Sequence, residues 1–237
     1  TLFRSGMLLG IDVGGTHTDA VLLDRTGLLA SAKVETLQDD LLQSILAALG
    51  RIRELAGDVE VQRFNLSTTL CTNAIVQDEL KPVGVMVSAG PGIDPESFRI
   101  GDHYEVIRGA LDHRGEEIQA LDGEQADRCA ERFLEQGLSV FAAVGKFSPR
   151  NPAHEERMSR SLSDRASFLT AGHWLSGQLN FPRRIATSYY NSAVWPIFND
   201  FASSVESSLE QFRISPQLNI LKADGGTMPL SQARRTP

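Results

Sequence analysis

A short stretch between two apolar runs carries the side chains best suited to hold an anion. Residues 12–18 read DVGGTHT. Glycines let backbone amides approach a ligand closely and permit positive φ, so consecutive amides can face one anion. The hydroxyls of Thr16 and Thr18 would add donors, and Asp12 at a strand end offers oxygens to Mg²⁺. The stretch predicts a phosphate site, although Gly-Gly is also a favoured turn in a plain hairpin.

Two common nucleotide motifs are excluded at this position. No GxGxxG pattern occurs there, and an apolar strand follows the turn, whereas a dinucleotide-binding loop opens a helix. No GK[ST] triplet is present either, which excludes a Walker A loop. Any phosphate binding here must therefore use a strand–turn–strand unit.

A second group of polar side chains stands at a predicted strand-to-helix junction, in the stretch LSTTLCTNAIV. Free amides and hydroxyls gather at such junctions. Thr68, Thr69 and Asn73 are therefore candidates for lining a site near the phosphate or the substrate. The alternative is that Ser67 or Thr68 simply caps the helix.

These side chains must be positioned by an α/β framework. Three apolar runs joined by tight turns predict an antiparallel meander, and a helix with one apolar face follows, capped by Asp39 or Asp40. Further strands and helices alternate beyond it, which is typical of an α/β protein. The predicted strands span residues 7–13, 18–24, 28–34, 61–67, 83–87, 139–147, 168–170 and 218–224, and the first helices span 41–55 and 69–77.

Capping patterns place the later helices. Asp122 stands three residues before Gln125, in a capping-box spacing, and Asn151 precedes Pro152 at a predicted helix start. The longest helical pattern runs over residues 185–212, where Pro196 is expected to kink or split the helix. Between residues 88 and 121 no regular pattern appears.

Composition excludes several functional classes. The net charge of −7 argues against nonspecific binding to nucleic acid or anionic membrane, and no apolar run approaches the ~20 residues of a membrane span. Cys71 and Cys129 have no metal-ligand spacing and are expected to be reduced thiols. Without a recognisable secretory signal, the cytoplasm is the expected location.

Four blocks together resemble one family. The stretches GIDVGGTHTDAVLLD, STTLCTNAIV, NPAHEER and KADGGTMPL occur in the order and spacing of the hydantoinase A/5-oxoprolinase family. The resemblance covers nearly all the chain from Leu8 onward. It implies an actin-like ATPase (ribonuclease H-like) fold, with a mixed sheet that begins in an antiparallel meander and is incomplete in this chain.

The resemblance also implies a chemistry. Members of the family resemble kinases that use ATP and Mg²⁺ to phosphorylate the carbonyl oxygen of a small cyclic amide, so that water can open the ring. By that likeness Asp12 would contact Mg²⁺ and act with Thr16 in catalysis. The phosphates would be received by Gly14, Gly15, Thr16, His17 and Thr18. His17 stands where an aromatic residue is expected, and Ser67 stands where a glycine is usual. A hydantoinase B-type subunit is the expected partner.

The expected organisation is a non-native leader at residues 1–6, an N-terminal family domain at 7–180 and the start of a second domain at 181–237. The chain would then be the N-terminal part of an enzyme and would not turn over ATP alone. A small-molecule kinase of the same fold and a non-catalytic ATP-binding regulator are the alternatives. The turn at Asp224 is interpreted as structural. Arg183 and Arg184 either hold an anion or form a solvated helix start.

Overall fold

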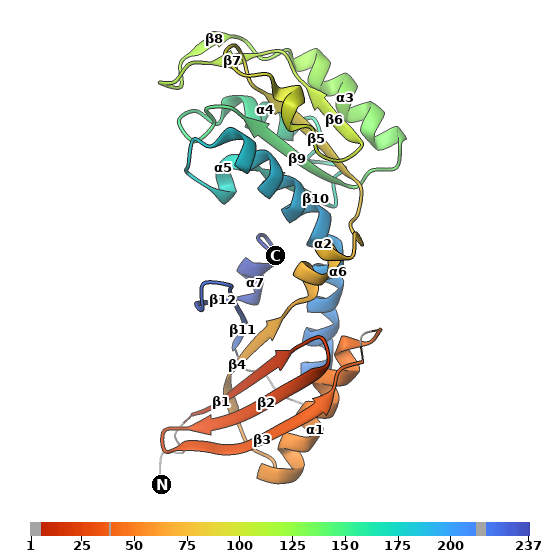
Figure 1. The fold of residues 1–237 in the computed structure, drawn as a ribbon, viewed down its shortest axis with the longest axis vertical. Helices are drawn as coiled ribbons and strands as arrows, with labels where there is room; N and C mark the ends of the chain where they lie inside the picture. Colours follow the sequence, from red (N-terminus) through yellow and green to blue (C-terminus); the bar gives the residue numbers. More distant parts are fainter. Residues whose placement is uncertain (1–5, 38, 212–216) are drawn as a thin grey trace. The chain divides into compact units, whose positions relative to one another are not determined.

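The computed structural model describes residues 6–37, 39–211 and 217–237. Residues 1–5 of the leader expected at 1–6 lie outside the described residues, and so does Phe212 of the predicted helix. The chain divides into two compact units (Figure 1). Unit 1 comprises residues 1–77 and 197–237, and unit 2 comprises residues 78–196. This division by contacts differs from the predicted family boundary at residue 180, which stays a prediction.

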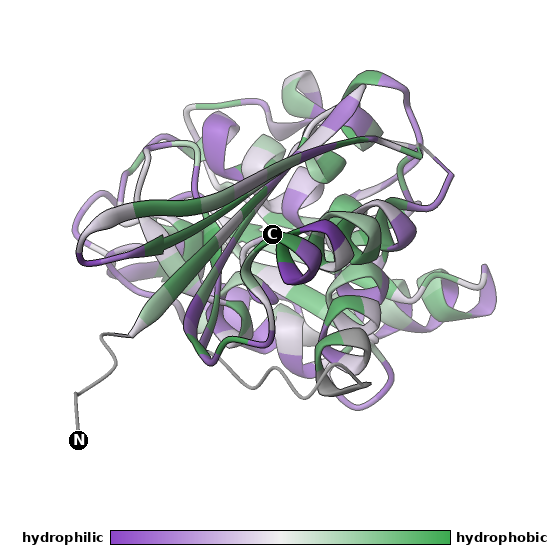
Figure 2. Ribbon diagram, turned by 90° about the horizontal axis from the view of Figure 1, so that it is seen from below, coloured by the Kyte–Doolittle hydropathy of each residue, from purple (hydrophilic) through white to green (hydrophobic). Residues whose placement is uncertain are grey.

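Unit 1 begins with the predicted meander. Strands β1 (Met7–Val13), β2 (His17–Asp24) and β3 (Gly27–Glu35) pair in antiparallel fashion, each with its neighbour along the chain. In Figure 2 apolar residues (green) run along these strands, and hydrophilic residues (purple) appear at the turns between them. These pairings confirm the predicted meander. It forms because the alternating apolar residues need one buried face, and because turns that contain glycine let the chain reverse within few residues.

The remaining strands extend the meander into a six-stranded mixed sheet of order β12-β11-β4-β1-β2-β3. Strand β4 (Val61–Thr68) runs parallel to β1, and β11 (Gln217–Leu221) runs parallel to β4. The other elements of this unit are α1 (Leu41–Ala56), α2 (Leu70–Val76), β12 (Thr227–Pro229) and α7 (Leu230–Ala233). Parallel strands end at the same edge of a sheet, so this topology decides which loops meet.

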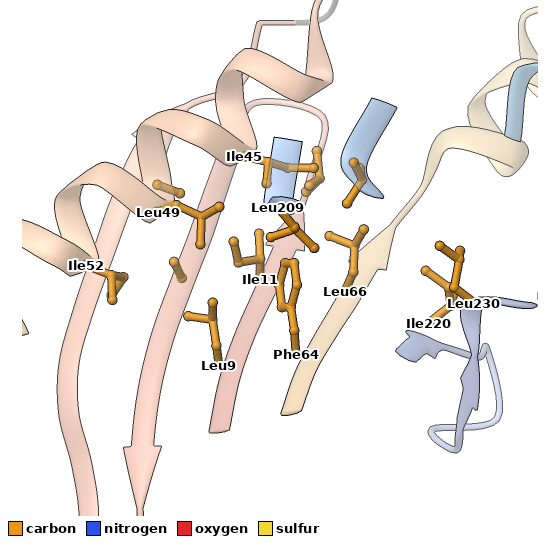
Figure 3. Close-up of a cluster of buried hydrophobic side chains, with 14 of the residues drawn as sticks. Leu9, Ile11, Ile45, Leu49, Ile52, Phe64, Leu66, Leu209, Ile220 and Leu230 are labelled. Carbon is orange, nitrogen blue, oxygen red and sulfur yellow. The ribbon is translucent and has the colours of Figure 1, made fainter. Parts of the chain in front are cut away.

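The core of unit 1 lies on one face of this sheet (Figure 3). Leu9 and Ile11 of β1 and Phe64 of β4 belong to one buried cluster with Ile45 and Leu49 of the helix α1. Side chains of a strand alternate between faces. Burial of Leu9, Ile11 and Val13 therefore forces Asp12 onto the opposite face, where it is exposed.

Unit 2 contains a parallel sheet of order β10-β9-β5-β6. Both faces of β5 and β9 are buried, which explains why these strands read as continuous apolar runs. Its elements are β5 (Val83–Ser88), η1 (Pro95–Phe98), β6 (His103–Val106), β7 (Ala110–Leu111), β8 (Glu117–Gln119), α3 (Gly123–Glu135), β9 (Val140–Gly145), α4 (Ala153–Arg160), β10 (Phe168–Ala171) and α5 (Gly172–Leu175).

The segment between residues 88 and 121, which shows no regular pattern, contains η1, β6 and the hairpin β7–β8. These elements are two to four residues long, too short to produce a readable period. Asp122 caps α3 as predicted, because its carboxylate accepts from the Gln125 amide at 2.9 Å. Gln125 does not reach back to Asp122. Its side chain instead bonds the Arg108 amide and the Val106 carbonyl, both at 2.9 Å.

Helix α6 (Phe181–Gln211) is the long helix that the apolar stripe predicts. It continues through Pro196 as an α-helix, so of the two expected effects of this proline the split is wrong, and the kink stays a prediction. The boundary between the two units nevertheless falls directly after Pro196. Among the described residues, no helix is long and apolar enough to cross a membrane.

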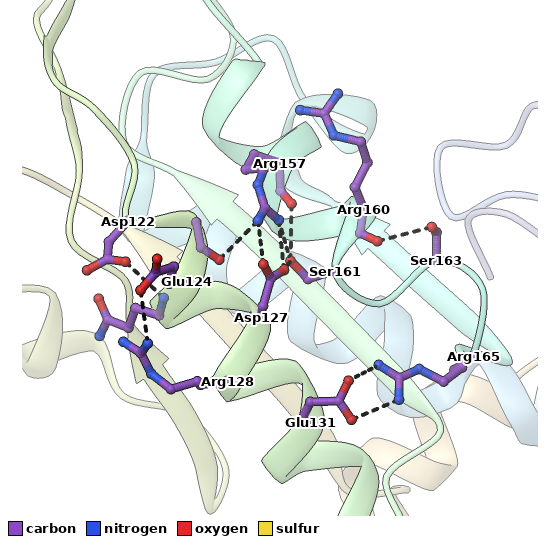
Figure 4. Close-up of polar contacts among 12 residues, drawn as sticks. Asp122, Glu124, Asp127, Arg128, Glu131, Arg157, Arg160, Ser161, Ser163 and Arg165 are labelled. Carbon is purple, nitrogen blue, oxygen red and sulfur yellow. Dashed lines mark hydrogen bonds and ion pairs between the residues drawn. The ribbon is translucent and has the colours of Figure 1, made fainter.

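Ion pairs connect α3 to α4 and to the segment that follows α4 (Figure 4). Arg157 donates to both carboxylate oxygens of Asp127, at 3.0 and 2.7 Å, and Ser161 donates to the same group at 2.7 Å. Arg165 pairs with Glu131 at 2.6 Å. The bonds from Arg157 and Ser161 hold the pKa of Asp127 below its usual value, since they favour the ionised carboxylate.

A buried ion pair anchors the carboxyl end of β9 to α4 and α6. Glu155 is fully buried and Arg184 is 2% exposed, with 3.2 Å between Arg184 Nη1 and Glu155 Oε1. Arg184 Nη2 donates to the carbonyls of Gly145 and Lys146, at 2.8 and 2.7 Å. Burial lowers the pKa of Arg184, and the charge of Glu155 opposes that shift. Arg184 is therefore not part of a solvated helix start.

We expect Glu155→Gln to lower the free energy of unfolding of unit 2 by about 3–5 kcal/mol, because it leaves the buried Arg184 charge uncompensated. Both tryptophans, Trp174 and Trp195, lie in unit 2, so tryptophan fluorescence in a urea titration reports on this unit. The exposed neighbour Glu156→Gln is the matched control and should change the value by less than about 0.5 kcal/mol. Equal effects of the two variants would contradict the role of the ion pair.

Candidate functional site

The turn between β1 and β2 is closed by its own backbone. The Gly14 amide donates to the His17 carbonyl at 3.1 Å, and the Thr36 amide donates to the Thr16 carbonyl at 2.9 Å. A Cβ atom at Gly14 would lie 2.9 Å from the His17 carbonyl oxygen, a separation that real Cβ atoms essentially never show. Gly14 does not have positive φ. Glycine is therefore needed here because the backbone passes so close. The expectation that this glycine would adopt positive φ is wrong.

Thr16 and His17 present the donors that the turn offers to solvent. Both residues are exposed, and Thr16 Oγ1 lies 3.1 Å from His17 Nδ1. The Thr16 amide has no hydrogen-bond partner among the described residues. The Gly14 amide, in contrast, is already used in closing the turn. An anion at this turn would thus meet the amide and hydroxyl of Thr16 and the imidazole of His17.

Thr18 faces the other way. Its side chain is completely buried, and its hydroxyl lies 2.9 Å from the hydroxyl of Thr36 on the core side of the sheet. The alternation along β2 explains this, because Thr18, Ala20 and Leu22 share the buried face. The expectation that the Thr18 hydroxyl donates to phosphate is corrected by this placement.

Asp12 lies in a polar row on the open face of the sheet. It stands opposite Asp19 on β2 and opposite Ser67 on β4, and Asp19 pairs with Lys33 of β3 at 2.9 Å. Like charges directly opposite each other destabilise a sheet, and the lysine offsets this for Asp19. An exposed carboxylate beside a second one fits the oxygen ligands that Mg²⁺ prefers. Asp19 and Lys33 were missed from sequence because only the register brings them beside Asp12.

The second predicted group lies at the junction between β4 and α2. Thr68 Oγ1 accepts from the Leu70 amide, the first of the helix, at 3.2 Å. The N-cap position itself is held by Thr69, whose side chain makes no capping hydrogen bond, so neither Ser67 nor Thr68 is the N-cap residue. Thr69 Oγ1 accepts from Asn73 Nδ2, also at 3.2 Å. A hydroxyl that accepts a hydrogen bond still has its own hydrogen to donate. Both threonines therefore remain able to contact a ligand, and their binding role stays a prediction.

Strand pairing brings the two groups to one edge. Because β1 and β4 are parallel, Asp12 stands beside Ser67 and Val13 stands beside Thr68, so the turn and the junction follow at the same edge. Strand β11 is parallel to β4, and its carboxyl end lies at this edge as well. In open α/β sheets, ligands bind outside the carboxyl ends of parallel strands. The structure thus gathers three loops, which follow Val13, Thr68 and Leu221 in the sequence.

The third loop is the turn after β11. The Asp224 carboxylate accepts from the Gly226 amide at 2.9 Å and pairs with Lys222 Nζ at 2.7 Å, and Gly225 has a φ of +83°. Both bonds hold the pKa of Asp224 below its usual value, and the bond from Lys222 has the larger effect. The turn satisfies its own polar groups, which supports the structural interpretation of this motif.

The cysteines do not contribute nucleophiles. Cys71 and Cys129 are free. Burial raises the pKa of the Cys71 thiol to about 11 and that of Cys129 to about 12. Both are therefore protonated at neutral pH, and only the thiolate is strongly nucleophilic. No group of three or more His, Cys, Asp or Glu side chains suited to hold a metal ion occurs within residues 6–37, 39–211 and 217–237.

Comparison with known proteins adds independent information. The family described as hydantoinase/oxoprolinase N-terminal region matches residues 8–165. The caprolactamase subunit alpha of Pseudomonas jessenii is 24% identical over 252 residues, which cover 93% of this chain and 36% of that protein. An uncharacterized protein of Methanocaldococcus jannaschii is 22% identical over 262 residues, covering 98% of this chain and 37% of its own length. The chain thus spans little more than a third of these relatives.

Solved structures agree on the fold. A nucleotide-free acetone carboxylase matches 99% of this chain and 39% of its own chain, with a TM-score of 0.81 at 16% identity. The ATP-dependent caprolactamase from Pseudomonas jessenii matches 94% of this chain and 36% of its own chain, with a TM-score of 0.80 at 22% identity. The α/β fold of actin-like ATPase type, with its mixed sheet and N-terminal meander, is thereby confirmed.

We expect Gly14→Ala to lower the free energy of unfolding of unit 1 by about 1–3 kcal/mol, because the new Cβ would collide with the His17 carbonyl and strain the turn. Far-UV circular dichroism in a urea titration measures this. Gly50→Ala is the control, because a Cβ atom at this position of helix α1 would meet no other atom within 4 Å. It should leave the free energy of unfolding unchanged or raise it by up to about 1 kcal/mol, since alanine favours a helix more than glycine does. A variant at Gly14 as stable as the native chain would refute the close-approach argument.

Proposed function

Because this chain belongs to the hydantoinase/oxoprolinase family through its N-terminal region, we propose that it supplies a phosphate-binding part of an ATP-dependent enzyme that opens small cyclic amides. The observation that carries the proposal is the meeting of two loops at one sheet edge. The exposed Thr16 turn follows β1, and the Thr68–Thr69 junction follows the parallel strand β4.

The proposed chemistry removes a specific obstacle. An amide resists hydrolysis because its nitrogen is a poor leaving group and its carbonyl is weakly electrophilic. Transfer of the γ-phosphoryl group of ATP to the carbonyl oxygen releases ADP and makes the ring carbon more electrophilic. Water then adds to that carbon, the C–N bond breaks as the nitrogen takes up a proton, and the resulting acyl phosphate is hydrolysed to a carboxylate and inorganic phosphate. Catalysis of phosphoryl transfer is mainly positioning and charge stabilisation, so a site for it needs donors toward the phosphates and a carboxylate for a divalent cation.

The residues of this chain would share those tasks. The amide and hydroxyl of Thr16 and the imidazole of His17 would donate to the phosphates, with Gly14 and Gly15 shaping the turn that presents them. Asp12 would hold Mg²⁺ or its waters, and Mg²⁺ when bound neutralises phosphate charge. Thr69 and Asn73, which are bonded to each other, would contact the substrate or the phosphate beside Thr68.

A second subunit is part of the proposal. The caprolactamase relative is itself described as a subunit alpha, which supports a complex of more than one chain. We therefore expect the complete enzyme to work with a hydantoinase B-type subunit. We expect the complete protein that contains this chain to bind ATP together with Mg²⁺.

The test is ADP release by the intact enzyme. We expect release to be stimulated by 5-oxoproline, hydantoins or other lactams and not by sugars. Stimulation by sugars would favour a small-molecule kinase, and slow release that no compound stimulates would favour a regulatory protein.

Asp12→Asn should lower kcat for the stimulated reaction by about 10²–10³-fold, the usual effect of removing a group that stabilises transition-state charge. The half-saturating Mg²⁺ concentration should rise in the same variant, since a neutral amide binds the cation more weakly. Asp200→Asn, an exposed aspartate of α6, is the control and should leave both quantities unchanged. If a folded Asp12→Asn enzyme keeps the native kcat and the native half-saturating Mg²⁺ concentration, Asp12 does not hold the metal.

A further inference from the structure

Unit 2 holds a second constellation that the phosphate site does not use. Its centre is the fully buried carboxylate of Glu155. Oxygen Oε1 accepts from the Gly145 amide at 2.7 Å, from Ser148 Oγ and from Arg184 at 3.2 Å. Oxygen Oε2 accepts from the His173 amide at 2.9 Å and contacts His173 Nδ1. The carboxylate therefore fixes both the backbone and the ring of His173.

These contacts decide the tautomer of His173. An ionised carboxylate only accepts hydrogen bonds, so the ring proton in the contact with Glu155 is on Nδ1. In a neutral imidazole the other nitrogen, Nε2, then presents a lone pair. Nε2 has no hydrogen-bond partner among the described residues and is not among their buried unpartnered atoms, so it reaches the surface. Arg184 balances the charge of Glu155, which leaves the acceptor in a locally neutral setting.

An exposed aromatic ring stands beside this acceptor. Trp174 is 62% exposed, and its ring centroid lies 5.8 Å from that of His173, with the planes at 64°. Packing does not explain this tryptophan, because most of its surface meets solvent. A fixed acceptor next to an apolar ring face suits a small molecule that has one N–H donor and a hydrocarbon ring.

The location agrees with ligand binding. Gly145 is the last residue of β9, and His173 follows the end of β10 by two residues, so both lie at the carboxyl edge of a parallel sheet. Such edges are where open α/β sheets bind ligands. A purely structural role accounts for the burial of Glu155 and Arg184. It accounts for neither the surface Nε2 nor the exposed indole.

We propose that His173 and Trp174 form a recognition site in unit 2 for a small cyclic amide, whose N–H donates to His173 Nε2 while its methylene groups pack against the indole. The choice of an amide rests on the proposed function, whereas the acceptor and the aromatic face rest on this geometry alone. Glu155 is a positioning residue that acts through His173.

The experiment compares two lactams that differ in one donor. The 237-residue chain, labelled with ¹⁵N-histidine, is titrated at pH 8 with 2-pyrrolidone and, separately, with N-methyl-2-pyrrolidone, which lacks the N–H. We expect 2-pyrrolidone to shift the Nε2 resonance of His173 and to saturate with a dissociation constant on the order of millimolar, as for a ligand of this size. The methylated lactam should bind about three- to tenfold more weakly, the usual effect of one lost hydrogen bond. The His173 resonance is identified by its absence in His173→Phe.

Variants separate the two contacts. Trp174→Ala should weaken 2-pyrrolidone at least threefold while keeping the preference for the N–H lactam, whereas His173→Phe, which has no acceptor in its ring, should abolish that preference. Trp195 reports whether each variant remains folded. Ile118→Ala removes another exposed apolar side chain of unit 2 and should change neither constant.

Equal affinity for the two lactams, unchanged binding in Trp174→Ala, or no saturation by 2-pyrrolidone up to about a hundred millimolar would each overturn the inference. All measurements are made without ATP, so they are independent of the phosphate site. If the intact enzyme releases ADP in response to lactams and its His173→Phe variant keeps the native KM, the recognition site is wrong, while the proposed function still stands.

Discussion

The pairing of β1 is the constraint on which the candidate phosphate site depends. Leu9, Ile11 and Val13 must face the core, and strand alternation then directs Asp12 to the open face. On one side β1 pairs with β2 through a turn so tight that only glycine fits at residue 14. On the other side it pairs in parallel with β4, which aligns the end of each strand with the end of the other. A shift of one residue in either pairing would bury the aspartate and separate the loops.

Both units place polar side chains at the end of a parallel sheet, but unit 1 exposes its charged groups and unit 2 buries them. In each, polar side chains gather at the carboxyl ends of parallel strands. Unit 1 leaves its carboxylate and its donors exposed, which suits a highly charged ligand that brings its own cation. Unit 2 buries Glu155 against Arg184 and presents the ring of His173 beside an exposed indole, the arrangement on which the lactam proposal rests.

Much of the framework was predictable because its signals are local. The meander follows from the alternation of apolar and polar residues, and helix α1 follows from apolar residues at helical spacing. The cap at Asp122 follows from a side chain that accepts a hydrogen bond from an amide three residues away. The short elements between residues 88 and 121 were not predictable, since strands of two to four residues have no readable period. The Gln125 side chain was misassigned because the loop carbonyl and amide that it bonds are distant in sequence.

The sequence by itself determined the kinds of chemistry available: a glycine turn with hydroxyls and an aspartate, and a resemblance that family and fold comparisons confirm. Tertiary structure decided which side chains are free to act. Thr18 is turned into the core, and Arg184 is held in a buried ion pair. The Thr16 amide has no hydrogen-bond partner within the part of the chain that the structure describes. The reason is that burial and hydrogen-bond partners come from strand register and helix packing, which join residues that the sequence keeps far apart.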